Sequence, residues 1–264
     1  MRLNKYISHH TKYSRREADG LIVSGVVTLN KKPLTDYSYD VQKDDKIFIK
    51  GKRVKETVGF TVIVYNKPKG VLVTKKDDRG RTTIYHKLPG KFRHFVPVGR
   101  LDYASEGLLL LTDNIDLSTA LMQSKLERTY NLKIDRRITT EMTDAIKEGL
   151  HLDDARAGAH NKSDIHGMSF APFTHFEIRN EGKRFTKLRV SITEGKNREL
   201  RRFFAHFGAN VLDLKRISFG EISLNNLPEN KVRYLTRKEY EAIRQFLKTY
   251  RKTTYNNQKQ PQKK

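Results

Sequence analysis

Residues Pro97–Asn114, with the sequence PVGRLDYASEGLLLLTDN, join a polar loop to a run of leucines. The run Leu108–Leu111 is closed by Thr-Asp-Asn, and this pattern predicts a short strand that is buried on both faces and ends in a turn. Packing explains the preceding loop less well, because Arg100 and Asp102 flank a single leucine. A carboxylate on a loop that enters a core strand either caps the local backbone or serves as a placed reactive group.

The charge of the chain predicts a polyanionic partner. Its 264 residues allow one large domain or two smaller ones, and Lys plus Arg number 53 against 30 acidic residues, for a formal net charge of +23. Nucleic acid is therefore expected before an anionic membrane. No apolar run approaches the roughly 18–20 residues that cross a bilayer, and the charged N-terminus lacks the apolar segment of a signal peptide.

The sequence supports neither a disulfide nor a cofactor. It has no cysteine, which excludes disulfides and cysteine-ligated zinc and fits a cytoplasmic protein. The nine histidines show no metal-ligand spacing, and there is no glycine-rich phosphate loop. We therefore expect no cofactor, no metal and no membrane association.

Residues 1–56 are predicted to form a module of their own. Ser14–Glu17 (SRRE) is a capping box that begins a helix, and Val26–Asn30 and Lys46–Ile49 are predicted strands. Basic residues with glycine at both ends follow at Gly51–Gly59 and predict a linker.

Arg15 and Arg16 lie in the first turn of that helix, where the helix dipole disfavours cations. They are either solvated or placed to reach a phosphate. The module resembles the S4 RNA-binding domain, an αL-type fold whose second helix and following loop dock on structured RNA. The resemblance rests on Arg2-Leu3, Ser14-Arg15-Arg16-Glu17-Ala18, Ile22, Ser24–Asn30 and Asp45-Lys46-Ile47. It implies RNA binding, not chemistry.

Residues 57–250 are predicted to form a larger domain of the α+β class, with a mixed, mainly antiparallel sheet flanked by helices. Segment 251–264 is basic without an acidic residue and predicts a disordered tail. The predicted strands are Val62–Tyr65, Val71–Thr74, Leu108–Leu111, Arg128–Ile134, Thr174–Arg179, Phe185–Thr193 and Val211–Ile217. The predicted helices are Leu117–Lys125 with Asp116 as cap, Thr140–Gly149, Arg198–Phe207 with Asn197 as cap, and a last helix that begins with the capping box Thr236–Glu239.

Two further places stand out besides Asp102. The first is Tyr130, which taken alone fits ordinary strand packing. The second is Arg198–Arg202 (RELRR), on a helix whose aromatic face is predicted to be buried. At least one of Arg201 and Arg202 should then lie near the edge of the core and need an anion, either an RNA phosphate or a protein carboxylate.

The chain as a whole resembles the pseudouridine synthases, specifically the RsuA-type branch that carries an N-terminal S4 domain. Four motifs carry the resemblance in the family's order: Asn66–Gly70 (NKPKG), Gly99–Asp102 (GRLD) with Ser105, Gly107 and the leucine strand, Arg128–Tyr130 (RTY), and Glu194–Arg202 (EGKNRELRR). Within the branch, the last motif looks most like the RluB-type enzymes of large-subunit ribosomal RNA.

The resemblance implies a role for each matched residue. Asp102 matches the essential aspartate, which attacks the ribose or abstracts a sugar proton as the glycosidic bond breaks. Tyr130 matches the aromatic residue that stacks on the target base, Leu200 the apolar floor of the pocket, and Arg201 the basic partner of the aspartate. We expect RNA contacts from Arg100, Arg15, Arg16, Lys67, Lys69, Arg198 and Arg202.

The implied activity is isomerisation of uridine to pseudouridine in ribosomal RNA. We expect the target to be 23S ribosomal RNA, alone or in a pre-ribosomal particle, and the enzyme to be a monomer. A non-catalytic S4-type ribosome-binding protein is the alternative, but it leaves Asp102, Tyr130 and Arg201 unexplained. A glycoside hydrolase is a weaker one, because it needs a second carboxylate about 5–10 Å from Asp102 and the sequence suggests no obvious candidate.

Overall fold

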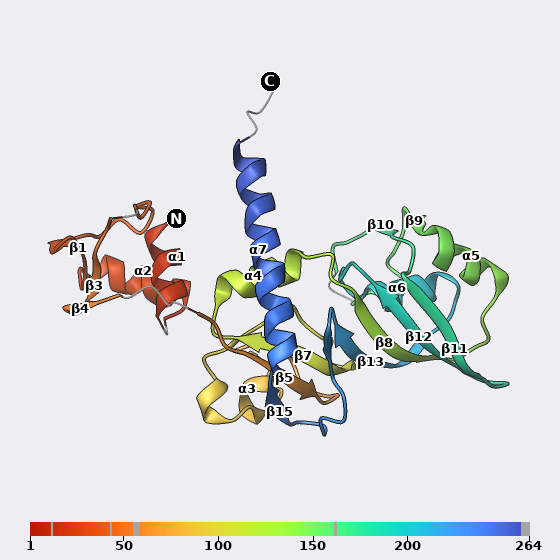
Figure 1. The fold of residues 1–264 in the computed structure, drawn as a ribbon. Coiled ribbons are helices and arrows are strands. Elements are labelled where there is room, and N and C mark those ends of the chain that lie inside the picture. The colour runs from red at the N-terminus through yellow and green to blue at the C-terminus, as the bar shows by residue number, and fades with distance from the viewer. Residues whose placement is uncertain (12, 43, 55–58, 161–162, 260–264) are drawn as a thin grey trace. The chain divides into compact units, whose positions relative to one another are not determined.

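A computed structural model describes the chain except for residues 12, 43, 55–58, 161–162 and 260–264, with side chains described as far as Tyr250. The chain divides into two compact units. The first comprises Met1–Thr61 with Asp113–Asp116, and the second comprises Val62–Thr112 with Leu117–Lys264 (Figure 1). The predicted domain boundary between residues 56 and 57 lies outside the described residues.

The first unit packs two helices on a small sheet. Its helices are α1 (Leu3–His10) and α2 (Arg15–Val23), and its strands, in the order β2-β1-β3-β4, are β1 (Val27–Leu29), β2 (Lys32–Pro33), β3 (Ile47–Ile49) and β4 (Lys52–Arg53). Apolar residues at helical and strand spacing fill its core, among them Leu3, Ile7, Ala18, Ile22, Val27 and Ile47.

The predicted capping box at the start of α2 is confirmed. Glu17 N donates to Ser14 Oγ at 3.3 Å, and Ser14 N donates to the Glu17 carboxylate at 2.7 Å. These two bonds satisfy backbone N–H groups that a helix start leaves without intrahelical partners. Arg15 and Arg16 are both exposed in the first turn.

The prediction of a linker over Gly51–Gly59 is wrong for its first part. Lys52–Arg53 form strand β4, which pairs with β3. Lys50 and Gly51 have φ values of +48° and +75°, and two successive residues with positive φ form the tight turn of a β-hairpin. Residues 55–58 lie outside the described part of the chain.

The second unit is built on a nine-stranded sheet. Its main path runs β11-β12-β8-β13-β7-β5-β15, with β14 beside β13 and β6 beside β7. All of these pairs are antiparallel except β13 with β7, so the predicted α+β class with a mixed, mainly antiparallel sheet is confirmed. The strands are β5 (Val62–Lys67), β6 (Val96–Pro97), β7 (Glu106–Thr112), β8 (Arg128–Ile134), β11 (His175–Glu181), β12 (Thr186–Ile192), β13 (Val211–Phe219), β14 (Ile222–Ser223) and β15 (Val232–Tyr234).

A separate two-stranded sheet and several helices complete the chain after residue 61. The small sheet pairs β9 (Leu150–Leu152) with β10 (Met168–Phe170). The helices are α3 (Ile84–Lys87), η1 (Gly90–Phe92, a 3-10 turn), α4 (Ile115–Gln123), α5 (Thr140–Glu148), α6 (Glu199–His206) and α7 (Arg237–Lys259). Asp116 lies inside the first turn of α4 and is not its cap. Helix α7 continues past the predicted boundary at residue 250 into the segment predicted as a disordered tail, and residues 260–264 lie outside the described residues.

One predicted strand does not form. The alternating residues Val71–Thr74 predict a strand, yet Leu72 makes only an isolated bridge to Thr83. Val71 and Val73 are buried in the core. The alternation of apolar residues therefore indicates contact with the core here, and not a strand in a ladder of hydrogen bonds. A period of two fixes which side chains are buried but does not supply a partner strand.

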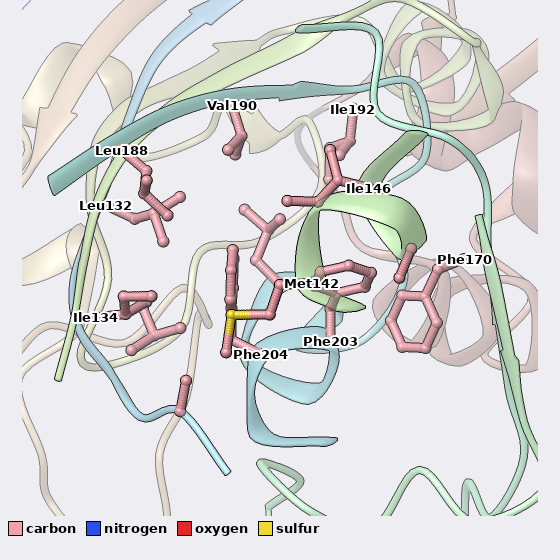
Figure 2. Close-up of a cluster of buried hydrophobic side chains, with 14 of the residues drawn as sticks. Leu132, Ile134, Met142, Ile146, Phe170, Leu188, Val190, Ile192, Phe203 and Phe204 are labelled. Carbon is pink, nitrogen blue, oxygen red and sulfur yellow. The ribbon is translucent and has the colours of Figure 1, made fainter. Parts of the chain in front are cut away.

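Helices α5 and α6 cover one face of the sheet. Figure 2 shows side chains from β8, β12, α5, α6 and β10 converging in a single cluster. Strand β8 alternates strictly between buried and half-buried residues, as its sequence predicts. The labelled members are Leu132, Ile134, Met142, Ile146, Phe170, Leu188, Val190, Ile192, Phe203 and Phe204. This packing fixes the position of α6 against β8 and β13.

The glycine at 107 lets the parallel strands β7 and β13 meet. Gly107 has φ +102°, and a Cβ there would lie 2.2 Å from the carbonyl oxygen of Arg216. We expect Gly107→Ala to lower the free energy of unfolding by about 2–5 kcal/mol, from backbone strain plus the clash. Urea denaturation measures this, with Gly90→Ala as control because nothing lies within 4 Å of a Cβ at Gly90. Equal stability of Gly107→Ala and the unmodified chain would contradict the expectation.

Candidate active site

A buried lysine holds the backbone of the Asp102 loop by hydrogen bonds. Lys67, at the end of β5, is fully buried, and its Nζ donates to the carbonyl oxygens of Pro68 (2.9 Å), Asp102 (3.1 Å) and Ser105 (2.8 Å). Ser105 N also donates to Asp102 O at 3.1 Å. The loop that carries the carboxylate is therefore held at both of its ends, directly before the buried strand β7.

Two guanidinium groups lie beside the Asp102 carboxylate. Arg198 Nη1 is 3.7 Å and Arg201 Nε 3.8 Å from Asp102 Oδ2. Both distances exceed those of hydrogen bonds, so the contacts are ion pairs that leave the carboxylate lone pairs available. The Asp102 side chain is 32% exposed while that of Arg201 is only 11% exposed, which places the carboxylate toward solvent and its partner behind it.

The protein backbone holds Arg201 in place. Its Nη1 donates to Val211 O at 2.8 Å, and its Nη2 contacts Ala104 O and Ser105 Oγ at 3.4 Å each. Burial lowers the pKa of Arg201, and the charge of Arg198 lowers it further, while Asp102 opposes both effects. Arginine stays protonated throughout the physiological range, so this site keeps its positive charge.

Arg198 has an unusual backbone conformation. Its φ of +52° is left-handed, and it, not the predicted Asn197, is the N-terminal flanking residue of α6. The Asn197 amide oxygen instead accepts from Arg202 Nη2 at 3.2 Å. Left-handed backbone is uncommon for a residue other than glycine and is retained mostly where function or packing requires it. Here it directs Arg198 so that Nε donates to Gly158 O at 2.7 Å while Nη1 faces Asp102.

A pocket of about 210 Å³ opens beside Asp102. It lies below the roughly 300–1,000 Å³ typical of sites for drug-sized ligands, so it suits a small planar group. Of the residues predicted to form the site, it brings together Arg100, Asp102, Tyr130, Arg198 and Leu200. Tyr130 and Leu200 are buried members of the hydrophobic cluster that also contains Leu132 and Phe203.

Three buried charged residues of this pocket were given no role from the sequence. Arg128, Glu199 and Arg216 all line it and are each at least 94% buried. Burial raises the pKa of Glu199, whose carboxylate accepts a hydrogen bond from Lys196 N at 2.9 Å. The pocket thus holds a second carboxylate, for which the sequence offered no candidate. Arg128 and Arg216 were detectable as charged residues at core-facing positions of alternating strands.

Two of the residues predicted to contact RNA are buried in this structure. Lys67 is buried under the Asp102 loop, and Arg202 is also fully buried. The Arg202 guanidinium donates to three carbonyl oxygens, of Asn197 (3.0 Å), Ala155 (2.5 Å) and Ile165 (3.2 Å), and to Ser163 Oγ (2.6 Å). The anion expected for one of the two arginines is found at Arg201, in the form of Asp102.

The remaining predicted contacts are solvent accessible. Arg100 is exposed at the pocket rim, and Lys69 is exposed and pairs with Asp213. Arg15 and Arg16 belong to the first unit. Within the described residues, no helix is long and apolar enough to cross a membrane, and no group of three His, Asp or Glu side chains is arranged to hold a metal.

The buried lysine gives a pH dependence that can be measured. Burial lowers the pKa of Lys67 to about 8, against the opposing charges of Asp102 and Glu106. Between about pH 8 and pH 10.5 the folded chain releases a proton that the unfolded chain still holds, so this lysine makes the free energy of unfolding rise with pH in that window. Relative to Lys67→Met, the gain should reach about 3 kcal/mol. Denaturation at several pH values tests this, and parallel curves for the two proteins would contradict it.

Two family models match this chain, one in its N-terminal part and one in the part that follows. Residues 61–206 match the family model described as RNA pseudouridylate synthase, and residues 1–47 match the S4 domain, as the sequence predicts. An uncharacterized RNA pseudouridine synthase of Helicobacter pylori (strain J99) is 47% identical over 249 residues, covering 94% of this chain and 95% of the relative.

Two further similarities extend over most of the chain. The ribosomal large subunit pseudouridine synthase B of Bacillus subtilis is 31% identical, covering 92% of this chain and 95% of the relative. A crystal structure of a pseudouridylate synthase superposes with a TM-score of 0.62 at 24% identity, covering 92% of this chain and 99% of that one. This structure establishes similarity of fold.

Proposed function

The chain belongs to the RNA pseudouridylate synthase family, and we propose that it converts a uridine of 23S ribosomal RNA to pseudouridine, with Asp102 as the essential carboxylate. The observation that carries the proposal is the pocket itself. It places one carboxylate, flanked by two arginines, beside a buried tyrosine and a buried leucine. A binding-only S4 protein has no need of that combination.

The reaction needs an anionic group at the sugar and a way to retain the base. The bond from ribose C1′ to uracil N1 breaks and a bond from C1′ to C5 forms, while the C5 proton passes to water and N1 gains a proton. Asp102 either attacks C1′ or takes a sugar proton as the first bond breaks. Both roles require an ionised carboxylate with a fixed orientation. Arg198 and Arg201 hold the carboxylate by their charges, and Lys67 holds the backbone of the same residue through its carbonyl oxygen.

Retention of the base falls to Tyr130 and Leu200. Turning a uridine out of an RNA stack costs a few kcal/mol. Stacking on an aromatic ring returns roughly 1–3 kcal/mol, and Tyr130 lines the pocket together with Asp102 and Leu200. Both side chains are packed into the main core, so the pocket is rigid before the RNA arrives.

The RNA itself is held by charge. The chain carries a formal net charge of +23, which predicts sequence-independent affinity that weakens steeply with added salt. In the proposed function, the S4 domain contributes Arg15 and Arg16, and the rim of the pocket contributes Arg100. We further propose that the enzyme acts as a monomer in the cytoplasm, on ribosomal RNA alone or in a pre-ribosomal particle.

Neutralising both arginines of the S4 domain should weaken RNA binding without changing the rate of the chemical step. For Arg15→Gln combined with Arg16→Gln, we expect weaker affinity for every RNA tested and a salt dependence (log K against log salt) shallower by up to about 2, one for each lost phosphate contact. Filter binding over a range of salt concentrations measures both. An unchanged slope would remove these two residues from the interface. Lys238→Gln, which removes an exposed positive charge from α7, is the control.

The target is tested by tritium release. Because the C5 hydrogen leaves once per pseudouridine formed, RNA transcribed with 5-tritiated uridine reports turnover directly. We expect release from 23S transcripts and none from 16S or transfer RNA transcripts, because the Bacillus subtilis relative is a ribosomal large subunit pseudouridine synthase. Release from 16S or transfer RNA alone would overturn the target, and release from none of them would overturn the function.

A further inference from the structure

A buried arginine in the pocket has a donor without a partner. Arg216 lies on β13, is 96% buried and lines the same pocket as Asp102. Its Nε donates to Leu108 O at 2.7 Å, which anchors the side chain. Its Nη2 has no hydrogen-bond partner among the described residues. Leaving a charged donor unpaired in a buried position is strongly unfavourable, so the free chain retains a group that a ligand would satisfy.

The neighbouring arginine shows what a purely structural role looks like. Arg128 lines the same pocket and is equally buried. Its Nη1 donates to Leu126 O (2.9 Å) and Thr193 O (2.6 Å), and its Nη2 donates to Ser124 O (3.3 Å). Both terminal nitrogens of Arg128 are therefore used by the protein, whereas Nη2 of Arg216 has no partner among the described residues.

The position of Arg216 relative to Tyr130 defines what it meets. In the antiparallel pairing of β13 with β8, Arg216 and Tyr130 are directly opposite each other, and both side chains line the pocket. Directly opposite residues on one face of a sheet have Cβ atoms about 5 Å apart. A base stacked on the Tyr130 ring therefore presents its edge to the guanidinium group of Arg216.

We propose that Arg216 Nη2 donates a hydrogen bond to a carbonyl oxygen of the target uracil, which makes Arg216 a base-binding residue of this enzyme. The inference rests on the proposed function. Uracil offers two acceptors, O2 and O4. When the bond to C1′ breaks, its electron pair stays on the base, and the negative charge spreads from N1 onto the carbonyl oxygens. A guanidinium donor binds this charged state more tightly than the neutral base, so it favours bond breaking.

Sulfur substitution in the RNA tests the contact atom by atom. RNA fragments that span the modified uridine are made with uridine, 2-thiouridine or 4-thiouridine at that position, because sulfur is a weaker acceptor than oxygen. With the unmodified enzyme, we expect one of the two thio-substrates to lower kcat/KM about tenfold or more. The position that responds identifies the carbonyl that Arg216 contacts.

Variants then assign the effect to Arg216. In Arg216→Met, turnover of the normal substrate should fall about 10–100-fold, mainly in kcat. The thio effect, which is the ratio of kcat/KM for the uridine substrate to kcat/KM for the thio-substrate, should shrink to nearly one. Arg216→Gln, whose amide can still donate to Leu108 O, should behave in the same way if Arg216→Met is unstable. Arg128→Lys is the matched control, because it disturbs a buried arginine of the same pocket and should leave the thio effect intact.

The outcomes separate this inference from the function on which it rests. An enzyme that turns over the normal RNA but is insensitive to both sulfur positions would overturn the contact with Arg216 while leaving the proposed function in place. A thio effect of equal size in Arg216→Met and in the unmodified enzyme would do the same. Absence of turnover of the normal RNA by the unmodified enzyme would overturn both.

Discussion

Asp102→Asn should abolish pseudouridine formation, with tritium release lowered at least about 10³-fold, while RNA affinity stays within about twofold. Asparagine keeps the shape of the side chain but removes the negative charge that the proposed chemistry requires, and removal of a catalytic group of this kind costs many orders of magnitude. Binding should persist because the proposed phosphate contacts are made by other residues of a strongly basic chain. Initial rates and filter binding on the same 23S transcript give both values.

A matched charge change separates this effect from a general one. Asp153→Asn removes the same charge from a fully exposed side chain and should leave tritium release unchanged. Activity of Asp102→Asn close to that of Asp153→Asn would contradict the role given to Asp102.

The second large effect is expected for Arg201→Met, which should lower kcat about 10²–10³-fold with a smaller change in KM. Arg201 is largely buried behind the partly exposed Asp102 carboxylate, and removing a preorganised charged donor of this kind from an active site typically costs about 10²–10³ in kcat. It also fixes the loop through Ala104 O and Ser105 Oγ, and small misplacements of a catalytic group cost about 10²-fold.

Combination with Asp102→Asn sharpens this prediction. If Arg201 acts through the carboxylate, the double variant should be no less active than Asp102→Asn alone, because effects of residues that act as a unit are not additive. The control Arg237→Met changes an exposed arginine at the start of α7 and should be neutral. A rise in KM without loss of kcat in Arg201→Met would contradict a positioning role.

Local sequence patterns predicted those elements whose shape depends on nearby residues. The leucine run of β7, the alternation of β8 and the capping boxes at Ser14 and Thr236 are all found where they were expected. Each depends on a period or a cap within a few residues of sequence, and physical chemistry fixes such features without knowledge of the rest of the fold.

Features that depend on distant segments were not predictable in this way. A basic residue in a matched motif was expected to contact RNA, yet Lys67 and Arg202 are buried and donate to backbone carbonyl oxygens far away in sequence. The sequence shows that a side chain is charged, but not whether the backbone around it supplies acceptors. The same limit applies to the start of α6, where the predicted Asn197 cap is displaced by Arg198 in a left-handed conformation.

The sequence predicted some residues of the candidate site and missed others. The family resemblance placed Asp102, Tyr130 and Leu200 in one pocket, and the structure brings them together there. It did not indicate Arg216, whose strand is matched by none of the four motifs, nor the second guanidinium group that Arg198 places beside Asp102. The alternation of its strand marks Arg216 as a charged residue that faces the core. Its place opposite Tyr130, and the approach of Arg198 to Asp102, follow from strand pairing and helix position, which only the folded chain reveals.

The most direct test of the account is made in cells that lack the gene. Pseudouridines are mapped in ribosomal RNA from that strain, and from the same strain carrying either the unmodified gene or Asp102→Asn at equal protein levels. The account predicts that one position in 23S RNA is uridine in the deletion strain, is pseudouridine with the unmodified gene, and stays uridine with Asp102→Asn. Restoration of that pseudouridine by Asp102→Asn would contradict the central claim.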